Sequence, residues 1–155
     1  MAESALVVPR GTVLGAGLQG WLRAAGDDGR VMRRVPPPAE LAFLGACHVL
    51  FLSAEDLGPD EARLLPGLFP LAEIVVVTEG AQGGRLYVDG AERRYLAHPA
   101  SEVDPTGAGD VFAAAFLLAL RSGRSPDESA AFGARAAAVA VTAPGPAALP
   151  RLRQG

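Results

Sequence analysis

Two aspartates enclose a turn of small residues in the stretch DPTGAGD, residues 104–110, and an almost wholly apolar segment follows it. Gly107, Ala108 and Gly109 stand where a helix is expected to begin, so their backbone N–H groups lack partners within the helix. Together with the helix dipole, such donors favour a phosphate or a developing oxyanion. Asp110 supplies a carboxylate that can accept the proton of an alcohol. This combination meets the needs of phosphoryl transfer to a hydroxyl group.

A purely structural explanation of Asp110 stays open. An aspartate in the first turn of a helix complements the helix dipole, which contributes up to about 1 kcal/mol. That explanation accounts less well for the neighbouring glycines, because each glycine costs a helix roughly 0.5–1 kcal/mol. The pattern therefore favours a functional turn with Asp110 as a catalytic base.

A second glycine-rich stretch, TEGAQGG at residues 78–84, leaves the end of an apolar strand. Ligands of open α/β sheets bind beyond the carboxyl ends of the strands. Glycines at Gly80 and Gly83 would let the backbone after Thr78 approach such a ligand closely. A plain turn into a hairpin explains the same letters about equally well.

A third stretch, GAGLQG at residues 15–20, matches the dinucleotide fingerprint G-x-G-x-x-G. The fingerprint requires a strand, a tight turn and a crossover helix. The segment that follows, WLRAAGDDG, is short and ends in a Gly-Asp turn. We therefore expect a glycine-rich loop here, and a nicotinamide-dependent oxidoreductase is the weaker alternative.

The chemistry-bearing turns are positioned by alternating strands and helices. Two continuous apolar runs, His48–Leu52 and Glu73–Thr78, predict strands buried on both faces, as in a parallel sheet between helices. The stretch RLYVDGAERRYL predicts a hairpin that turns at Asp89-Gly90. Short strands are also expected at 5–8 (ALVV) and 12–14 (TVL), within a segment rich in Gly, Pro and Arg. The alternation indicates an α/β fold of three layers, α/β/α, around a mostly parallel sheet.

Helices are expected over residues 39–46, from Pro59 onward, over 107–121 and after Ser125. The helix over 107–121 is apolar nearly all round and is expected to be deeply buried. Ser125 and Glu128 form a capping box at the start of the last helix, whose many alanines allow close packing. A proline-rich coil, APGPAALP, follows it.

Composition excludes several classes of protein. The chain has 155 residues, a net charge of −3 and no basic cluster, which argues against a nucleic-acid partner. All fourteen basic residues are arginine, so a Walker A loop with its lysine is excluded. The single cysteine, Cys47, excludes an internal disulfide, and His48 and His98 are expected to be structural or surface residues. No signal peptide or membrane span is expected, which favours a soluble protein of the cytoplasm.

Taken together, these motifs resemble the ribokinase-like (PfkB) carbohydrate kinases. The stretch VDPTGAGDVFAAAFL is similar to the C-terminal signature of that family, and VVVTEGAQGG to its nucleotide-binding loop. The stretch AAFGARAAAVAVTAPGPAALP resembles its last helix and the loop that closes over adenine. The resemblance implies a ribokinase-like sandwich and an ATP-dependent kinase with an alcohol acceptor, that is, a sugar, a polyol or a nucleoside.

The resemblance also implies roles for individual residues. Asp110 would be the catalytic base, and Gly107, Ala108 and Gly109 would form the anion hole. The nucleotide ATP would be held by a set of small residues, namely Thr78, Gly80, Gly83 and Ala134. Mg²⁺ would travel with the nucleotide. Many members hold a potassium ion, for which the matching positions are Asp104, Thr106, Ala140, Ala143 and Gly145.

Two departures from the family pattern stand out. The family carries an N-x-x-E motif that tunes phosphate and Mg²⁺ binding, where this chain has Ser53 and Asp56. Family members are also longer, and their first strands, lid and most sugar contacts would lie before residue 1. Residues 1–155 are accordingly expected to form a single partial kinase domain, with 1–38 as a loop-rich leading segment. The exposed sheet edge would favour a homodimer, and a truncated nucleotide-binding module without turnover is the alternative function.

Overall fold

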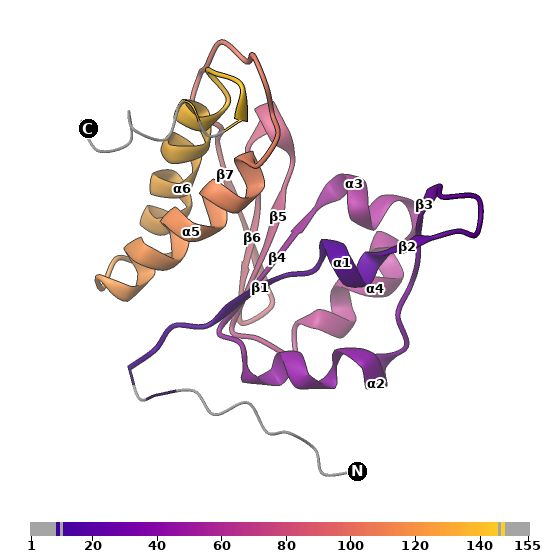
Figure 1. Cartoon of the computed structure of the whole chain (residues 1–155). Coiled ribbons are helices and arrows are strands. Elements are labelled where there is room, and N and C mark those ends of the chain that lie inside the picture. The colour runs from indigo at the N-terminus through magenta and orange to yellow at the C-terminus, as the bar shows by residue number, and fades with distance from the viewer. Residues whose placement is uncertain (1–8, 10, 146, 148–155) are drawn as a thin grey trace.

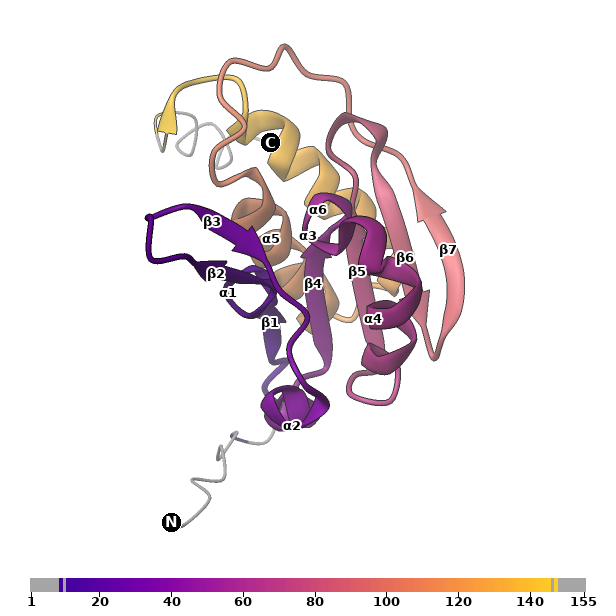
Figure 2. The same ribbon diagram turned by 90° about the vertical axis from the view of Figure 1, so that its right-hand side faces the viewer.

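The computed structural model describes residues 9, 11–145 and 147, so the strand expected at 5–8 lies outside the described residues. One five-stranded sheet forms the centre of the fold (Figures 1 and 2). Its strands, in spatial order, are β1 (Gly15–Gly17), β4 (Val49–Ser53), β5 (Ile74–Thr78), β6 (Gly84–Val88) and β7 (Ala91–Tyr95). The first three strands are parallel, and β6 and β7 add an antiparallel hairpin.

Helices cover both faces of this sheet, which confirms the three-layer architecture (Figure 1). Two long helices lie on one face, α5 (Ala108–Arg121) and α6 (Pro126–Ala140). The other face carries shorter helices, namely α1 (Gln19–Leu22), α2 (Pro38–Leu41), α3 (Ala54–Leu57) and α4 (Glu61–Leu68). Single 3₁₀ turns occur at Ala42–Ala46, Gly58–Asp60 and Gly80–Gln82. Within the described part of the chain no helix is long and apolar enough to cross a membrane.

The strands β4 and β5 are apolar up to their last residues, Ser53 and Thr78, because each of their faces meets a different helical layer. In β4, Val49 and Phe51 pack in the core under α5 and α6, whereas Leu50 and Leu52 pack in the core on the opposite face. The residues of β5 alternate between the same two cores. Successive side chains of a strand point to opposite faces, so a strand between two cores needs no polar position. The two strands predicted from apolar runs are thereby confirmed.

The connections follow their local turn chemistry. Asp89 and Gly90 have φ angles of 49° and 78°, as a two-residue hairpin turn requires, so the predicted hairpin is confirmed. At the start of α6 the Ser125 hydroxyl accepts from the N–H of Glu128, and the Glu128 carboxylate accepts from the N–H of Ser125. The predicted capping box is therefore present. It leaves α6 beginning at Pro126, whose missing N–H costs nothing at a first helical position.

The structure corrects two expectations for the first part of the chain. Residues 12–14 form no strand, and the strand is Gly15–Gly17 instead, so the stretch GAGLQG is not a simple loop. Gly15 fits this strand because Phe51 and Leu117 crowd it, and a Cβ there would come within 2.9 Å of the Phe51 ring. The four-residue α1 and a second hairpin, β2 (Arg23–Ala25) with β3 (Val31–Arg33), follow it. This is not the long crossover helix of a dinucleotide-binding unit.

A third correction concerns α5. Phe112, Ala115, Phe116 and Ala119 are buried, but the side chain of Leu118 is 68% exposed. The helix meets the sheet and α6 along two sides only, so its third side faces outward despite an apolar sequence. The expectation of a deeply buried helix is therefore wrong for this outer side. An apolar sequence does not show how many sides of a helix are covered by other elements.

Gly84 offers a test of how closely β6 packs against its neighbours in the sheet. A Cβ at this position would lie 2.3 Å from the carbonyl oxygen of Val77 and 2.4 Å from the hydroxyl of Tyr95. Gly84→Ala is expected to lower the free energy of unfolding by about 1–3 kcal/mol, the usual cost of overpacking. Urea denaturation of both proteins measures the change.

Gly67 in α4 is the matched control, because a Cβ there meets no atom within 4 Å. Gly67→Ala is expected to be neutral or to stabilise the protein by up to about 1 kcal/mol, since alanine is the better helix former. Equal losses in the two variants would contradict the packing described for Gly84.

Candidate active site

The turn before Asp110 is built as a helix start with bare backbone. Gly107 caps α5 with a φ of 79°, and a Cβ on Gly107 or Gly109 would meet no atom within 4 Å. The N–H of Ala108 donates to the carbonyl oxygen of Pro105, at 3.1 Å. The N–H groups of Gly109 and Asp110 donate to no partner among the described residues. Two unengaged donors at the positive end of a 14-residue helix are suited to binding an anion.

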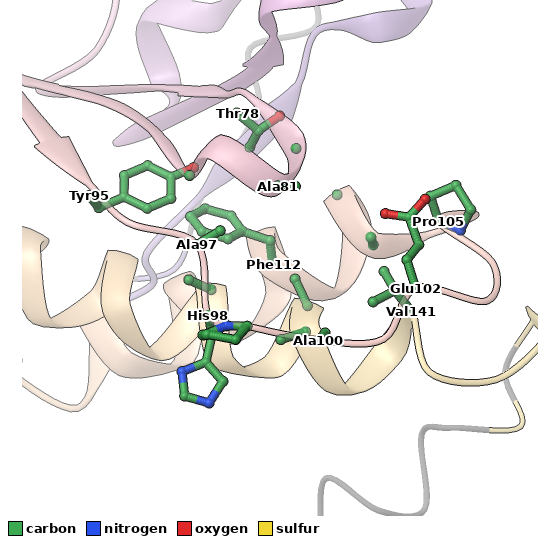
Figure 3. Close-up of a pocket in the computed structure, with 18 residues that line it drawn as sticks. Thr78, Ala81, Tyr95, Ala97, His98, Ala100, Glu102, Pro105, Phe112 and Val141 are labelled. Carbon is green, nitrogen blue, oxygen red and sulfur yellow. The ribbon is translucent and has the colours of Figure 1, made fainter.

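A cavity of about 420 Å³ opens beside this turn. It brings together three of the predicted sets: Thr78, Gly80 and Gly83 after β5; Ala108 and Gly109 at the start of α5; and Ala134 in α6. Figure 3 shows the loop with Thr78 and Ala81 on one side of this cavity and Val141 on another. The volume lies within the range of sites for small organic ligands, roughly 300–1,000 Å³. Segments far apart in the sequence thus converge on one site.

The walls of the cavity are mostly apolar. Tyr95 and Phe112 stack with ring centroids 5.3 Å apart and planes inclined by 26° (Figure 3). Ala134, Ala137 and Ala138 line the α6 side, where their small side chains leave open space. A smooth apolar slot beside aromatic rings suits a flat heterocycle.

The loop after β5 needs its glycines for two reasons. Gly80 and Gly83 have φ angles of 58° and 89°, which favour glycine. A Cβ on Gly83 would also lie 2.2 Å from the carbonyl oxygen of Tyr95. Glu79 closes the loop through its N–H, which donates to the carbonyl oxygen of Gly83 at 2.8 Å. The loop is therefore a tight structure pressed against β7 rather than an open connection.

The segment before the helix is tied to the segment after α6. One carboxylate oxygen of Asp104 accepts from the N–H of Thr106 at 2.9 Å, and the other accepts from the N–H of Gly145 at 3.0 Å. The carbonyl oxygen of Val141 accepts from the N–H groups of Val103 and Asp104. The structure thus brings Asp104, Thr106 and Gly145 together, next to the end of α6 at Ala140.

Residues 22–152 match the family described as pfkB family carbohydrate kinase. The chain belongs to this family. Among curated relatives, the inositol 3-kinase of Oryza sativa subsp. japonica is 50% identical over 68 residues, which are 44% of this chain and 17% of that protein. A 68-residue stretch of this chain is therefore similar to part of a protein named as an inositol kinase.

Solved structures of kinases share the fold. Adenosine kinase from Sinorhizobium meliloti superposes with a TM-score of 0.63 at 30% identity, over 74% of this chain and 38% of that one. Arabidopsis thaliana ribokinase, solved with ribose and ATP, superposes with a TM-score of 0.59 at 27% identity, over 70% of this chain and 38% of that one. The fold is ribokinase-like, and the chain spans well under half the length of these relatives.

Ser53 and Asp56, which stand where the family has its N-x-x-E motif, do not line the cavity. Ser53 caps α3, and its hydroxyl donates to Asp56 at 2.7 Å. The other carboxylate oxygen of Asp56 accepts from Arg23, with Nε at 2.7 Å and Nη2 at 2.6 Å. The Asp56 side chain is only 4% exposed. The structure therefore places Asp56 of α3 in an ion pair with Arg23, whereas Ser53, at the end of β4, lies beside Thr78 of β5 in the sheet.

Several residues of the site were not singled out from the sequence. Tyr95 and Phe112 line the cavity, but the sequence shows them only as parts of a hairpin and an apolar helix. His98 also lines the cavity, from the loop after β7, whereas His48 has a structural role and accepts the N–H of Leu14 at Nδ1. Cys47 is buried, and burial raises the pKa of its thiol. Alternation and turn signals carry no information on which side chains meet across the fold.

The link from Asp104 to the last loop should depend on pH. The hydroxyl of Thr106, then the N–H groups of Thr106 and Gly145, hold the pKa of Asp104 below its ordinary value of 3.8. A carboxyl whose pKa is lowered in the folded state keeps its contribution above the unfolded value and loses it as the pH falls through the folded value. NMR spectra recorded from about pH 6 down to about pH 2 should therefore show the chemical shifts of the Thr106 and Gly145 amides changing only below about pH 4. Asp104→Asn should remove this titration, and an unchanged titration would contradict the link.

The hydroxyl of Tyr95 gives a second prediction. It is buried and has no partner among the described residues, and burial raises its pKa. Because an unpaired buried hydroxyl costs about 1–3 kcal/mol, Tyr95→Phe is expected to leave the melting temperature unchanged or to raise it. A clear fall in calorimetry would show that the hydroxyl has a stabilising partner.

Proposed function

We propose that this chain is the nucleotide-binding and catalytic part of an ATP-dependent carbohydrate kinase, a phosphotransferase to an alcohol group. One observation carries the proposal: a single cavity runs from the alanines of α6, past the Thr78–Gly83 loop, to the bare turn before Asp110. Its apolar end suits a nucleotide base, and its glycine end suits a phosphate. The solved ribokinase relative that was crystallised with ATP supports this nucleotide.

The residues present fit a nucleoside triphosphate. Glycines at Gly80, Gly107 and Gly109 leave open space where a Cβ would stand, so the backbone can approach phosphate oxygens closely. Ala134 would lie against the base, and Thr78 would face the sugar or the first phosphates. The anion position formed by Gly109 and Asp110 N–H groups, next to Gly107 and Ala108, would receive the transferring phosphoryl group.

In the proposed reaction Asp110 accepts the proton of the acceptor hydroxyl. The acceptor oxygen attacks the γ-phosphorus, and the bond between that phosphorus and the β–γ bridging oxygen breaks. The electron pair leaves with ADP, and the proton remains on Asp110 until solvent removes it. The N–H donors at the start of α5 stabilise the negative charge that develops on the transferring group. Asp110 is exposed, which leaves its carboxylate accessible to an acceptor.

Metal ions enter the proposal in different ways. Mg²⁺ would neutralise charge on the phosphates when it is bound with the nucleotide. No cluster of three or more His, Cys, Asp or Glu side chains within the described ranges could hold a metal ion, so phosphates and water would supply most ligands. Potassium beside Asp104 and Thr106, with carbonyl groups near Ala140, Ala143 and Gly145, stays a prediction.

The acceptor is proposed to be a sugar, a polyol or a nucleoside. Inositol 3-kinase and adenosine kinase, two of the similar proteins, bear names that cover a cyclic polyol and a nucleoside. A second candidate function is nucleotide binding without turnover. It is favoured by one observation, namely that the chain covers only 38% of the adenosine kinase chain. The cytoplasm remains the expected location.

Asp110→Asn separates these functions. In the kinase proposal the variant loses the proton acceptor, so acceptor-dependent ADP release is expected to fall at least about 100-fold. The affinity for ATP should change little, because asparagine keeps the backbone donors and the helix start. ADP release from Mg-ATP, measured across a panel of sugars, polyols and nucleosides, tests the expectation and names the acceptor class.

The control is Asp127→Asn, which changes an exposed aspartate in the first turn of α6 that pairs with Arg93. It should leave turnover unchanged. Turnover that survives in Asp110→Asn would remove Asp110 as the base. ATP binding by the unaltered chain without ADP release for any acceptor would support the non-catalytic candidate.

A further inference from the structure

Glu79 stands inside the candidate nucleotide loop, yet its side chain does not line the cavity. Thr78 and Gly80 on either side of it do. One carboxylate oxygen of Glu79 accepts from Nε of Arg85 at 2.6 Å, and the other accepts from Nη2 of Arg94 at 2.6 Å. The Glu79 side chain is 14% exposed. We call Glu79 with Arg85 and Arg94 the Glu79 clamp.

The clamp is anchored in the body of the fold. Arg85 on β6 is 12% exposed and also donates to Glu61 of α4, with Nη2 3.0 Å from Oε2. This hydrogen bond lowers the pKa of Glu61, and the same bond raises the pKa of Arg85. Arg85 also donates to the hydroxyl of Tyr87. Because Arg85 holds two carboxylates, Glu79 is fixed to a helix and a strand that do not belong to the loop.

The backbone of Glu79 also holds the loop. Its N–H donates to the carbonyl oxygen of Gly83 at 2.8 Å, and its carbonyl oxygen accepts from Gln82 at 3.2 Å. Gly80, by contrast, has open space on its Cβ side and a φ of 58°. Gly83 packs the end of the loop against β7, and its N–H donates to the carbonyl oxygen of Gly80 at 3.1 Å. The start of the loop is held at Glu79, through both its backbone and its side chain.

We propose that Glu79 is a positioning residue, which sets the Gly80–Gly83 loop for the phosphates of the nucleotide before the nucleotide binds. The inference rests on the proposed function, because the loop is the phosphate-facing side of the same cavity. Glu79 lies within the proposed nucleotide motif TEGAQGG, but its carboxylate pairs with Arg85 and Arg94 and not with the cavity. The clamp thus supplies preorganisation, which lowers the cost of ordering the loop on binding.

The test compares ligands that do and do not use the loop. Adenosine fills the base end of the cavity, whereas ADP and ATP add phosphates. For Glu79→Gln, calorimetric titration is expected to show about tenfold weaker ADP and ATP binding, since a small displacement of positioning groups has effects of this size. Adenosine affinity is expected to stay within about twofold of the unaltered chain, a difference below 0.5 kcal/mol.

A second variant guards against loss of folding. Arg94 is 59% exposed, so Arg94→Met removes one of the two anchors at little risk to the core. It should weaken ADP binding in the same direction as Glu79→Gln, by a smaller factor. Arg93→Met is the matched control, because Arg93 lies next to it on β7 and pairs with Asp127 rather than with the loop. That control should bind all three ligands as the unaltered chain does.

Hydrogen exchange supplies a readout without ligand. In Glu79→Gln the amides of Gln82 and Gly83 are expected to exchange at least about tenfold faster, whereas the amides of β5 keep their protection. Weakening that is equal for adenosine, ADP and ATP would mean a general loss of stability and would overturn the inference. Unchanged loop exchange would do the same. If the unaltered chain binds no nucleotide at all, the proposed function fails, and this inference fails with it.

Discussion

The ring of Phe112 joins the core of the molecule to the cavity. It packs edge-on against Phe51 of β4 at 6.4 Å and stacks on Tyr95 of β7 at 5.3 Å. Gly133 of α6 leaves room for it, since a Cβ there would come within 3.0 Å of the ring and of the Phe112 carbonyl oxygen. The spacing of α5, α6 and the sheet is thus set around one side chain. Because Phe112 follows Asp110 by two residues, this packing also decides how α5 presents its first turn to the cavity.

The parts of the fold that the sequence predicted are those whose causes are local or periodic. The strands at Val49–Ser53 and Ile74–Thr78 follow from continuous apolar runs, and the hairpin follows from Asp89-Gly90. The strand at Gly15–Gly17 has no such signal, because it is defined by its pairing with β4, and its Gly15 by the bulk of Phe51 and Leu117. Likewise, the apolar sequence of α5 does not show that Leu118 is exposed. Such features depend on contacts between segments far apart in the chain.

The candidate site likewise has features that the sequence predicts and features that it does not. Features that depend on the backbone, such as the glycines around Gly83 and the helix start at Ala108, can be recognised in the sequence. Glycine is favoured where φ is positive, and small residues are needed where the backbone must stay uncovered. Side chains that act by packing or pairing are not visible in this way. The residues around Asp56 give no sign that it pairs with Arg23, which is 33 residues away in the sequence. Tyr95, which lines the cavity, belongs to no recognisable motif. Local motifs thus locate a site, and the fold supplies its walls and its counter-ions.

The pairing of the acidic side chains supports the role proposed for Asp110 independently of its sequence motif. Asp56 and Glu79 are each paired with arginine, and Asp104 accepts two backbone N–H groups. Asp110 alone among these four has no hydrogen bond or ion pair to its carboxylate within the described part of the chain. A general base must be able to take up a proton, and cations or hydrogen-bond donors held against a carboxylate stabilise its ionised form and so make it a weaker base. Glu79 and Asp104 are thus engaged in holding loops next to the cavity, and Asp56 is engaged outside it. Asp110 is left free beside the unengaged N–H donors, where the proposed acceptor hydroxyl and phosphate would meet.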